Sequence, residues 1–180
     1  MQLLKVAKRD FLYSFGHGYS LPPESVTIEV NYDCMFHCQM CQMWNKDFKI
    51  SRIGDNKILS RYEIEAVIDE LSFLRVKSIS FCGGEPFLRK DLLDIVKYCK
   101  SRMLHCSTFT NGYLIREDLA KNIVLSGLNS ISISIDGAKS ELHDEIRGFK
   151  GAFDHAVEGI RLIKKQQKEY NTDLPKVFIH

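Results

Sequence analysis

The stretch Ser130-Ile131-Ser132-Ile133-Ser134-Ile135 says most about the fold of this chain. Its serines and isoleucines alternate without a break, and successive side chains of a β-strand point to opposite faces of the sheet. A strand over residues 130–135 therefore has one apolar face that can pack on a core. Its other face is polar and can line a wet space.

Four other segments have strand patterns, and helical patterns separate them. The predicted strands cover residues 25–31, 78–82, 106–110, 130–135 and 176–180. The predicted helices carry apolar residues at helical spacing from Ile64 to Leu74, from Leu92 to Cys99, at Leu119 and Ile123, and from Phe153 to Ile163. Ser60 and Glu63 form a capping box before the first of them. Strands that alternate with helices predict βαβ units and a parallel sheet.

The polar parity of these strands predicts a barrel with a wet interior. Strands covered by helices on both faces would be continuously apolar, but here Ser, Thr, Cys, Glu and Asn occupy one parity. We assign Cys82 to this inner face, together with Cys106, Thr108 and Thr110. The alternative is an antiparallel sheet with one solvated face, which the helical spacers disfavour. We therefore predict an α/β fold, a partial (β/α)6 TIM-like barrel with parallel strands and a polar lumen, incomplete at the C-terminus.

The predicted barrel occupies residues 25–180, and the chain ends inside its fifth strand. Residues 1–24 precede it as an N-terminal extension, in which Leu3, Leu4, Ala7 and Phe11 indicate a short amphipathic helix. Because no run of consecutive apolar residues exceeds three, we expect no membrane span. The N-terminus also lacks the apolar stretch of a signal peptide, so we expect a cytoplasmic protein.

Composition is that of an ordinary globular protein, with 180 residues, 44% hydrophobic and 27% charged. The net charge of +2 comes with no basic stripe, so there is no clear nucleic-acid signal. The six cysteines are more informative. In a reducing compartment clustered cysteines hold metal more often than they form disulfides.

Cys34, Cys38 and Cys41 follow the first predicted strand with the spacing CxxxCxxC. Thiolates are the ligands of iron–sulfur clusters, and three of them leave one metal position open, as catalytic sites do. A zinc site would need a fourth ligand, for which His37 is the candidate. A buried cysteine stripe is the remaining alternative, and the polar flanking residues disfavour it.

This cysteine pattern after the first strand of a βα barrel resembles that of the radical S-adenosylmethionine (SAM) enzymes. The resemblance implies a 4Fe-4S cluster on the three cysteines, with SAM on the fourth iron. It also implies that one electron, from a flavodoxin or a ferredoxin-like donor, cleaves SAM to a 5′-deoxyadenosyl radical. That radical would abstract hydrogen from a substrate that the sequence does not identify. The alternative is a non-catalytic iron–sulfur or zinc-binding module on the same scaffold.

Further motifs of the family follow at the ends of the later predicted strands. Gly83-Gly84-Glu85 resembles the motif that binds the SAM ammonium group, and Arg147 resembles an arginine placed against the SAM carboxylate. Met40 stands where many members have an aromatic residue near the adenine. By resemblance, the SAM-binding residues are Met40, Gly83, Gly84, Glu85, Thr110, Asn111, Ser134, Asp136 and Arg147.

The resemblance names no catalytic residue that contacts the substrate. Cys41-Gln42-Met43-Trp44 and the segment after Glu85 look most like the SPASM-type branch, whose C-terminal extension carries further cysteine-bound clusters. Of the remaining cysteines, Cys99 fits the apolar stripe of a helix. We expect Cys82 and Cys106 to be small buried residues on the inner parity.

Overall fold

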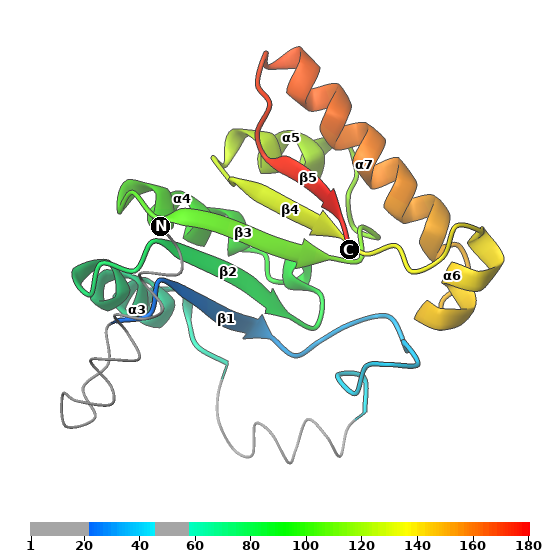
Figure 1. The fold of residues 1–180 in the computed structure, drawn as a ribbon, viewed down its shortest axis with the longest axis horizontal. Helices are drawn as coiled ribbons and strands as arrows, with labels where there is room; N and C mark the ends of the chain where they lie inside the picture. Colours follow the sequence, from blue (N-terminus) through cyan, green and yellow to red (C-terminus); the bar gives the residue numbers. More distant parts are fainter. Residues whose placement is uncertain (1–21, 46–57) are drawn as a thin grey trace, which may run out of the picture.

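The computed structural model describes residues 22–45 and 58–180, so the predicted N-terminal helix lies outside the described residues. Five parallel strands form one sheet in the order β1-β2-β3-β4-β5 (Figure 1). They are β1 (Ser25–Asn31), β2 (Ser78–Gly83), β3 (His105–Thr110), β4 (Ser130–Ile133) and β5 (Lys176–Ile179). The predicted parallel α/β architecture is confirmed. The division of the chain at residue 24 stays a prediction.

The helices connect successive strands. They are α3 (Arg61–Phe73), α4 (Leu92–Ser101), α5 (Glu117–Leu125), α6 (Ser140–Arg147) and α7 (Ala152–Glu169), with a 3₁₀ turn η1 at Pro86–Leu88. The capping box is confirmed: Ser60 N–H donates to Glu63 at 2.7 Å, and Glu63 N–H donates to the Ser60 hydroxyl at 3.4 Å. The sequence did not predict α6, because His143 is its only buried side chain and it has no apolar stripe.

One face of the sheet packs on the helices and forms the main core. Ile79 and Phe81 of β2 and Ile131 and Ile133 of β4 are fully buried there, against apolar side chains of α3, α4, α5 and α7. Burial of about 25 cal/mol for each Å² of apolar surface makes this the main stabilising contact of the fold. The opposite face turns toward the viewer in Figure 1.

The face predicted for the third strand is wrong. Cys106 pairs in register with Ile79, and Thr108 pairs with both Phe81 and Ile131. These side chains therefore face the helices, while Ser107 and Phe109 face inward. A thiol and a threonine methyl group pack well in a core, and the Thr108 hydroxyl is satisfied by the carbonyl of Phe81 at 3.0 Å. The expectation of burial is confirmed for Cys106, and Cys99 is buried in the core as well, but it is wrong for Cys82, which is only partly buried.

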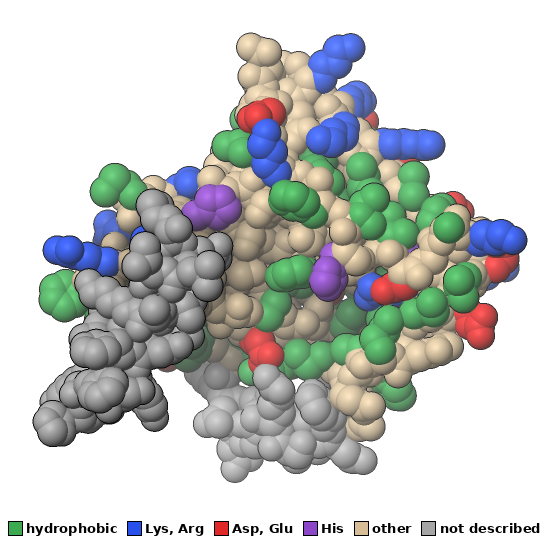
Figure 2. Space-filling view, viewed as in Figure 1, with side chains coloured by type: hydrophobic (Ala, Val, Ile, Leu, Met, Phe, Trp, Pro, Cys, Tyr) green, Lys and Arg blue, Asp and Glu red, His purple; other side chains and the backbone are tan. Residues whose placement is uncertain are grey.

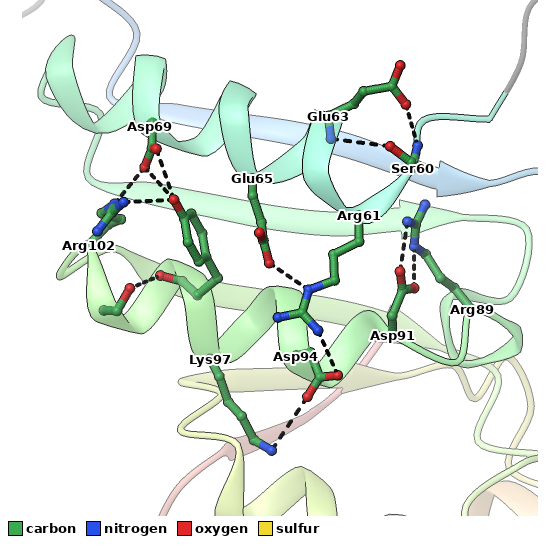
Figure 3. Close-up of polar contacts among 12 residues, drawn as sticks. Ser60, Arg61, Glu63, Glu65, Asp69, Arg89, Asp91, Asp94, Lys97 and Arg102 are labelled. Carbon is green, nitrogen blue, oxygen red and sulfur yellow. Dashed lines mark hydrogen bonds and ion pairs between the residues drawn. The ribbon is translucent and has the colours of Figure 1, made fainter.

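Polar side chains join the outer surfaces of α3 and α4. Arg61 binds Asp94 at 3.0 Å, and Asp69 accepts from both Tyr98 and Arg102 (Figure 3). Because these groups are exposed to water, each contact contributes little to the stability of the fold. Among the described residues, no helix is both long and apolar enough to cross a membrane.

Two glycines bring the ends of β1 and β2 together. Gly84 N–H donates to the carbonyl of Asn31 at 3.1 Å, and Glu85 N–H donates to the carbonyl of Asp33 at 2.7 Å. Gly83 has a φ of +132°, a conformation that other residues rarely adopt. These glycines therefore allow a close backbone approach between the loop after β2 and the loop after β1.

We expect Gly84→Ala to destabilise the chain by about 3 kcal/mol or more, since the new Cβ would lie 2.1 Å from the backbone oxygen of Asp33. Gly151→Ala is the control, because Gly151 has a φ of +84° but a Cβ added there would meet no described atom within 4 Å. It should cost only about 1–2 kcal/mol of conformational energy. Thermal melting of both variants compares them, and equal losses would contradict the account.

Candidate active site

A cavity of about 330 Å³ opens at the carboxyl ends of the strands. Polar groups at this end of parallel strands form the active sites of barrel enzymes. Every residue predicted to hold the cluster or SAM lines it. These are Cys34, Cys38, Met40, Cys41, Gly83, Gly84, Glu85, Thr110, Asn111, Ser134, Asp136 and Arg147. Figure 2 shows this end of the sheet, where hydrophobic, histidine and charged side chains meet. The structure thus brings together residues that are far apart in the sequence.

The cysteine loop follows β1 and is anchored by an aromatic cluster that the sequence did not predict. Phe36 is buried, stacks on Phe149 with ring centroids 4.6 Å apart, and meets the edge of Tyr113 at 5.8 Å. Gln39 N–H donates to the carbonyl of Ile146 at 2.9 Å, which ties the loop to α6. Figure 1 shows the loop reaching from the end of β1 toward α6.

Each thiol of this loop has a hydrogen-bond donor or a cation near it. Phe36 N–H lies 3.5 Å from the Cys34 sulfur, and Met43 N–H lies 3.4 Å from the Cys41 sulfur. An Arg147 nitrogen lies 3.8 Å from the Cys38 sulfur. Such donors stabilise bound thiolates and tune iron–sulfur clusters.

Burial favours the protonated form of two of these thiols, those of Cys34 and Cys38. Burial raises the pKa of the Cys34 and Cys38 thiols, although the Phe36 N–H and Arg147 partly oppose it. Within residues 22–45 and 58–180, no group of His, Cys, Asp and Glu side chains is close enough to hold a single metal ion. A cluster differs from a single ion in this respect, because each cysteine binds a different iron atom and the sulfurs stand further apart.

Glu85 is a buried carboxylate, only 1% exposed. Its oxygens accept from Phe87 N–H at 3.1 Å, the Thr110 hydroxyl at 2.8 Å and Asn111 N–H at 2.8 Å. Burial raises its pKa from 4.5 to about 6, against the effect of these donors. No described side chain forms an ion pair with it, so the charge of Glu85 lacks a cationic partner in the folded chain.

Asp136 and Arg147 form the opposite wall of the cavity. Arg147 Nε donates to Asp136 Oδ2, and the two side chains are 15% and 23% exposed. This contact orients the guanidinium of Arg147. Ser134 lies beside them, just after the end of β4, and its N–H continues the ladder to the carbonyl of Thr110 at 3.0 Å. No hydrogen bond of the Ser134 hydroxyl to another described residue is formed, so it is free for a ligand.

Asn111 and Met40, two of the predicted SAM-binding residues, do not simply add polar groups to the wall of the cavity. Asn111 directs its amide toward sulfur, 3.9 Å from Cys34 and 3.3 Å from the Met35 thioether. Met40 is 59% exposed at the rim of the cavity. Asn111 therefore links the end of β3 to the cysteine loop. Met40 has a flexible side chain, which can adapt to a ligand more readily than Asn111 can.

Aromatic side chains on the inner face were missed by the sequence analysis. Phe109 pairs with Ser132, which pairs with Phe178, so two rings flank a serine on the inner face. His180 meets the Phe109 ring edge-on at 5.5 Å, and both line the cavity. Because Ser132 and Ser134 are small, side chains of β3 and β5 can meet above β4. The lumen is thus less polar than predicted, and the parity of Phe109 was the available signal.

Comparison with known proteins decides the family. The model of the radical SAM superfamily matches residues 28–178. The chain belongs to the radical SAM superfamily. It is 33% identical over 155 residues to the Fe-coproporphyrin III synthase of Methanosarcina barkeri, covering 81% of this chain and 37% of that protein. It is 35% identical over 144 residues to the probable GTP 3′,8-cyclase of Saccharolobus islandicus, covering 79% and 44%.

Solved structures of radical SAM proteins share the fold. Streptococcus suis SuiB bound to S-adenosylmethionine matches with a TM-score of 0.72 at 20% identity, over 98% of this chain and 38% of SuiB. The anSMEcpe structure with bound AdoMet matches with a TM-score of 0.65 at 21% identity, over 87% and 44%. The predicted partial TIM-like barrel is confirmed. The chain spans less than half the length of the curated relatives named here.

Proposed function

We propose that this chain supplies the cofactor half of a radical SAM enzyme, in which a 4Fe-4S cluster and SAM generate a hydrogen-abstracting radical. The observation that carries the proposal is one cavity in which three free cysteines face a buried carboxylate that has no cationic partner among the described residues. The relatives are named for an iron porphyrin and for GTP, which are chemically different compounds. The region that this chain shares with both relatives therefore supports a step that is common to them and that comes before the specific substrate is recognised.

The donor set fits the cluster. Cys34, Cys38 and Cys41 are free thiols on one loop, and thiolates are the ligands that iron–sulfur clusters take. Bound there, the cluster supplies one electron to SAM and so produces methionine and the 5′-deoxyadenosyl radical. The chain contributes the N–H groups near the thiolates and the half-buried surroundings that limit access of water.

The polar groups of the cavity fit SAM. Glu85 complements the ammonium group, because a buried carboxylate gains most from a cation that replaces lost hydration. Arg147, held by Asp136, complements the carboxylate, and the Ser134 hydroxyl is placed for the carboxylate or the ribose. Gly83, Gly84, Thr110 and Asn111 shape the wall around Glu85, and Met40 lies at the rim, where the adenine would contact it.

The test of this function is anaerobic reconstitution with iron and sulfide, followed by SAM and dithionite. We expect a brown protein that forms 5′-deoxyadenosine and methionine. A flavodoxin or ferredoxin-like protein, the expected physiological electron donor, should replace dithionite. A protein that binds iron or zinc tightly but releases no 5′-deoxyadenosine would favour the non-catalytic module instead.

The affinity for SAM should depend on pH through Glu85. The ammonium group binds the ionised carboxylate, and the pKa of Glu85 in the free protein is about 6. Binding should therefore be full above pH 6 and weaken as the pH falls through 6, by about tenfold for each further unit. Titrations between pH 5 and 7 measure this. A Glu85→Gln variant should lose the pH dependence, and an equal dependence in that variant would contradict the assignment.

The inner aromatic side chains support a planar ring as the substrate group. Phe109 and Phe178 are 39% and 55% exposed on the inner face, so both rings offer apolar surface to a ligand there. An iron porphyrin and GTP, for which the relatives are named, both contain planar conjugated rings. We propose that these two side chains stack on such a ring beside the SAM site.

Phe178→Leu, which keeps an apolar side chain but removes the ring, should weaken the binding of a stacked ring about three- to tenfold. Coproporphyrin III and GTP are the two probes, followed by absorbance and fluorescence. Phe73→Leu, at an exposed aromatic side chain of α3 remote from the cavity, should change nothing. Equal binding by the wild-type chain and both variants, or no saturable binding of either probe, would refute the stacking proposal.

A further inference from the structure

His143 is a fully buried histidine on α6 that none of the sequence motifs includes. Its Nδ1 accepts the backbone N–H of Asp136 at 3.1 Å. The two preceding N–H groups, of Ser134 and Ile135, donate to the carbonyls of Thr110 and His180. The imidazole of His143 thus accepts the next backbone N–H after the last hydrogen bonds between the strands. This hydrogen bond fixes the backbone of Asp136 at the wall of the cavity.

This contact requires a neutral imidazole. When Nδ1 accepts a hydrogen bond, the ring proton lies on Nε2, which has no partner among the described residues. Burial lowers the pKa of His143, and nearby Arg147 lowers it further. A protonated ring would direct its Nδ1–H toward Asp136 Oδ2, 3.7 Å away. Arg147 binds the same Asp136 Oδ2 atom, so a neutral His143 ring does not compete with the arginine for that oxygen.

The imidazole ring of His143, which α6 carries, packs against α7. Phe153 meets it edge to face, with centroids 5.8 Å apart. Asp144 caps the start of α7 by accepting from Phe153 N–H at 2.9 Å. On the other side Gly137 lies so close that a Cβ there would be 3.1 Å from the backbone nitrogen of His143. The loop that carries Asp136 and Gly137 therefore packs directly against the helix that carries His143.

We propose that His143 is a positioning residue that holds Asp136, and through Asp136 the Arg147 guanidinium, in place for the SAM carboxylate. The proposal rests on the proposed function, in which Arg147 contacts SAM. Arg147 is bound through Nε to Asp136, and its Nη1 lies 3.8 Å from the Cys38 sulfur. Its Nη2 makes no hydrogen bond within the described parts of the chain, so the guanidinium keeps a donor for a ligand.

The test compares His143→Leu with His143→Asn in the chain carrying its reconstituted cluster. Leucine removes the acceptor at similar volume, while asparagine places a carbonyl oxygen near the position of Nδ1. We expect the SAM dissociation constant to rise about tenfold in His143→Leu and less than about threefold in His143→Asn. Where His143→Leu does not fold, His143→Gln serves, because its amide lies at the Nε2 position, out of reach of Asp136 N–H.

A double-mutant cycle with Asp136→Asn separates positioning from simple packing. If His143 acts through Asp136, the double variant binds SAM no more weakly than the worse single variant. Phe153→Leu is the packing control, since it disturbs the same ring but leaves its hydrogen bond, and it should bind SAM normally.

Additive losses, or an unchanged dissociation constant in His143→Leu while the wild-type chain binds SAM, would overturn this proposal alone. So would a loss in Phe153→Leu as large as that in His143→Leu. A wild-type chain that loads its cluster but does not bind SAM would overturn the proposed function, and this inference with it.

Discussion

Cys38→Ala should lose the iron–sulfur cluster and, with it, all formation of 5′-deoxyadenosine. Cys38 is the most buried of the three cysteines in the loop, and an Arg147 nitrogen lies near its sulfur. With one thiolate removed, two ligands remain on the loop, which are too few for a stable cubane with an open corner. The measurement is iron content and absorbance after anaerobic reconstitution, together with product analysis. We expect both to fall to the background of the cluster-free protein.

Cys82→Ala is the matched control for this prediction. Cys82 also lines the same cavity, but it lies near the end of β2 and outside the CxxxCxxC loop. The Cys82→Ala variant should keep its iron content and its formation of 5′-deoxyadenosine. The ligand assignment would be wrong if Cys38→Ala held a normal cluster, or if Cys82→Ala lost it.

Glu85→Gln should load its cluster normally but bind SAM at least about 100-fold more weakly. The substitution keeps the shape of the side chain and removes the charge that pairs with the ammonium group, an interaction worth about 3 kcal/mol or more when buried. The amide nitrogen also cannot accept from Asn111 N–H, so one buried hydrogen bond is lost. We therefore expect a modest loss of stability, about 1–3 kcal/mol, beside the much larger loss of affinity.

Glu29→Gln controls for the removal of a carboxylate from the sheet. Glu29 lies on the inner parity of β1, in register with Cys82, and it is not part of the cavity wall. The Glu29→Gln variant should bind SAM with the affinity of the wild-type chain. Cluster content measured beside SAM binding separates the two functions of the site, and a Glu85→Gln variant that binds SAM normally would remove Glu85 from it.

The sequence predicts the site well because its motifs are local and lie at strand ends. The first cysteine of the loop comes three residues after β1, the Gly83-Gly84-Glu85 motif begins on the last residue of β2, and Asn111 directly follows β3. Parallel strands bring their carboxyl ends to one edge, so local motifs become a cavity without knowledge of any long-range contact. The positions of the strands and of most helices along the chain follow from the same periodic patterns.

What the sequence does not predict depends on contacts between distant segments. Thr108 and Cys106 suit a core as well as a lumen, and only their register with neighbouring strands places them on the helix side. The hydrogen bond from Asp136 to His143 joins a loop to a helix that has no apolar stripe. Gly84 is needed because the Asp33 backbone lies against it, which no pattern within the β2 motif reveals.

The central claim is that three thiolates of this loop hold a cluster whose open iron binds SAM. Electron paramagnetic resonance of the reduced cluster, recorded with SAM labelled by ¹⁵N in the amino group and ¹⁷O in the carboxylate, tests it most directly. We predict hyperfine coupling to both labels, which Glu85→Gln weakens and Cys38→Ala abolishes together with the cluster signal. A reduced cluster whose spectrum is the same with and without labelled SAM would contradict the account.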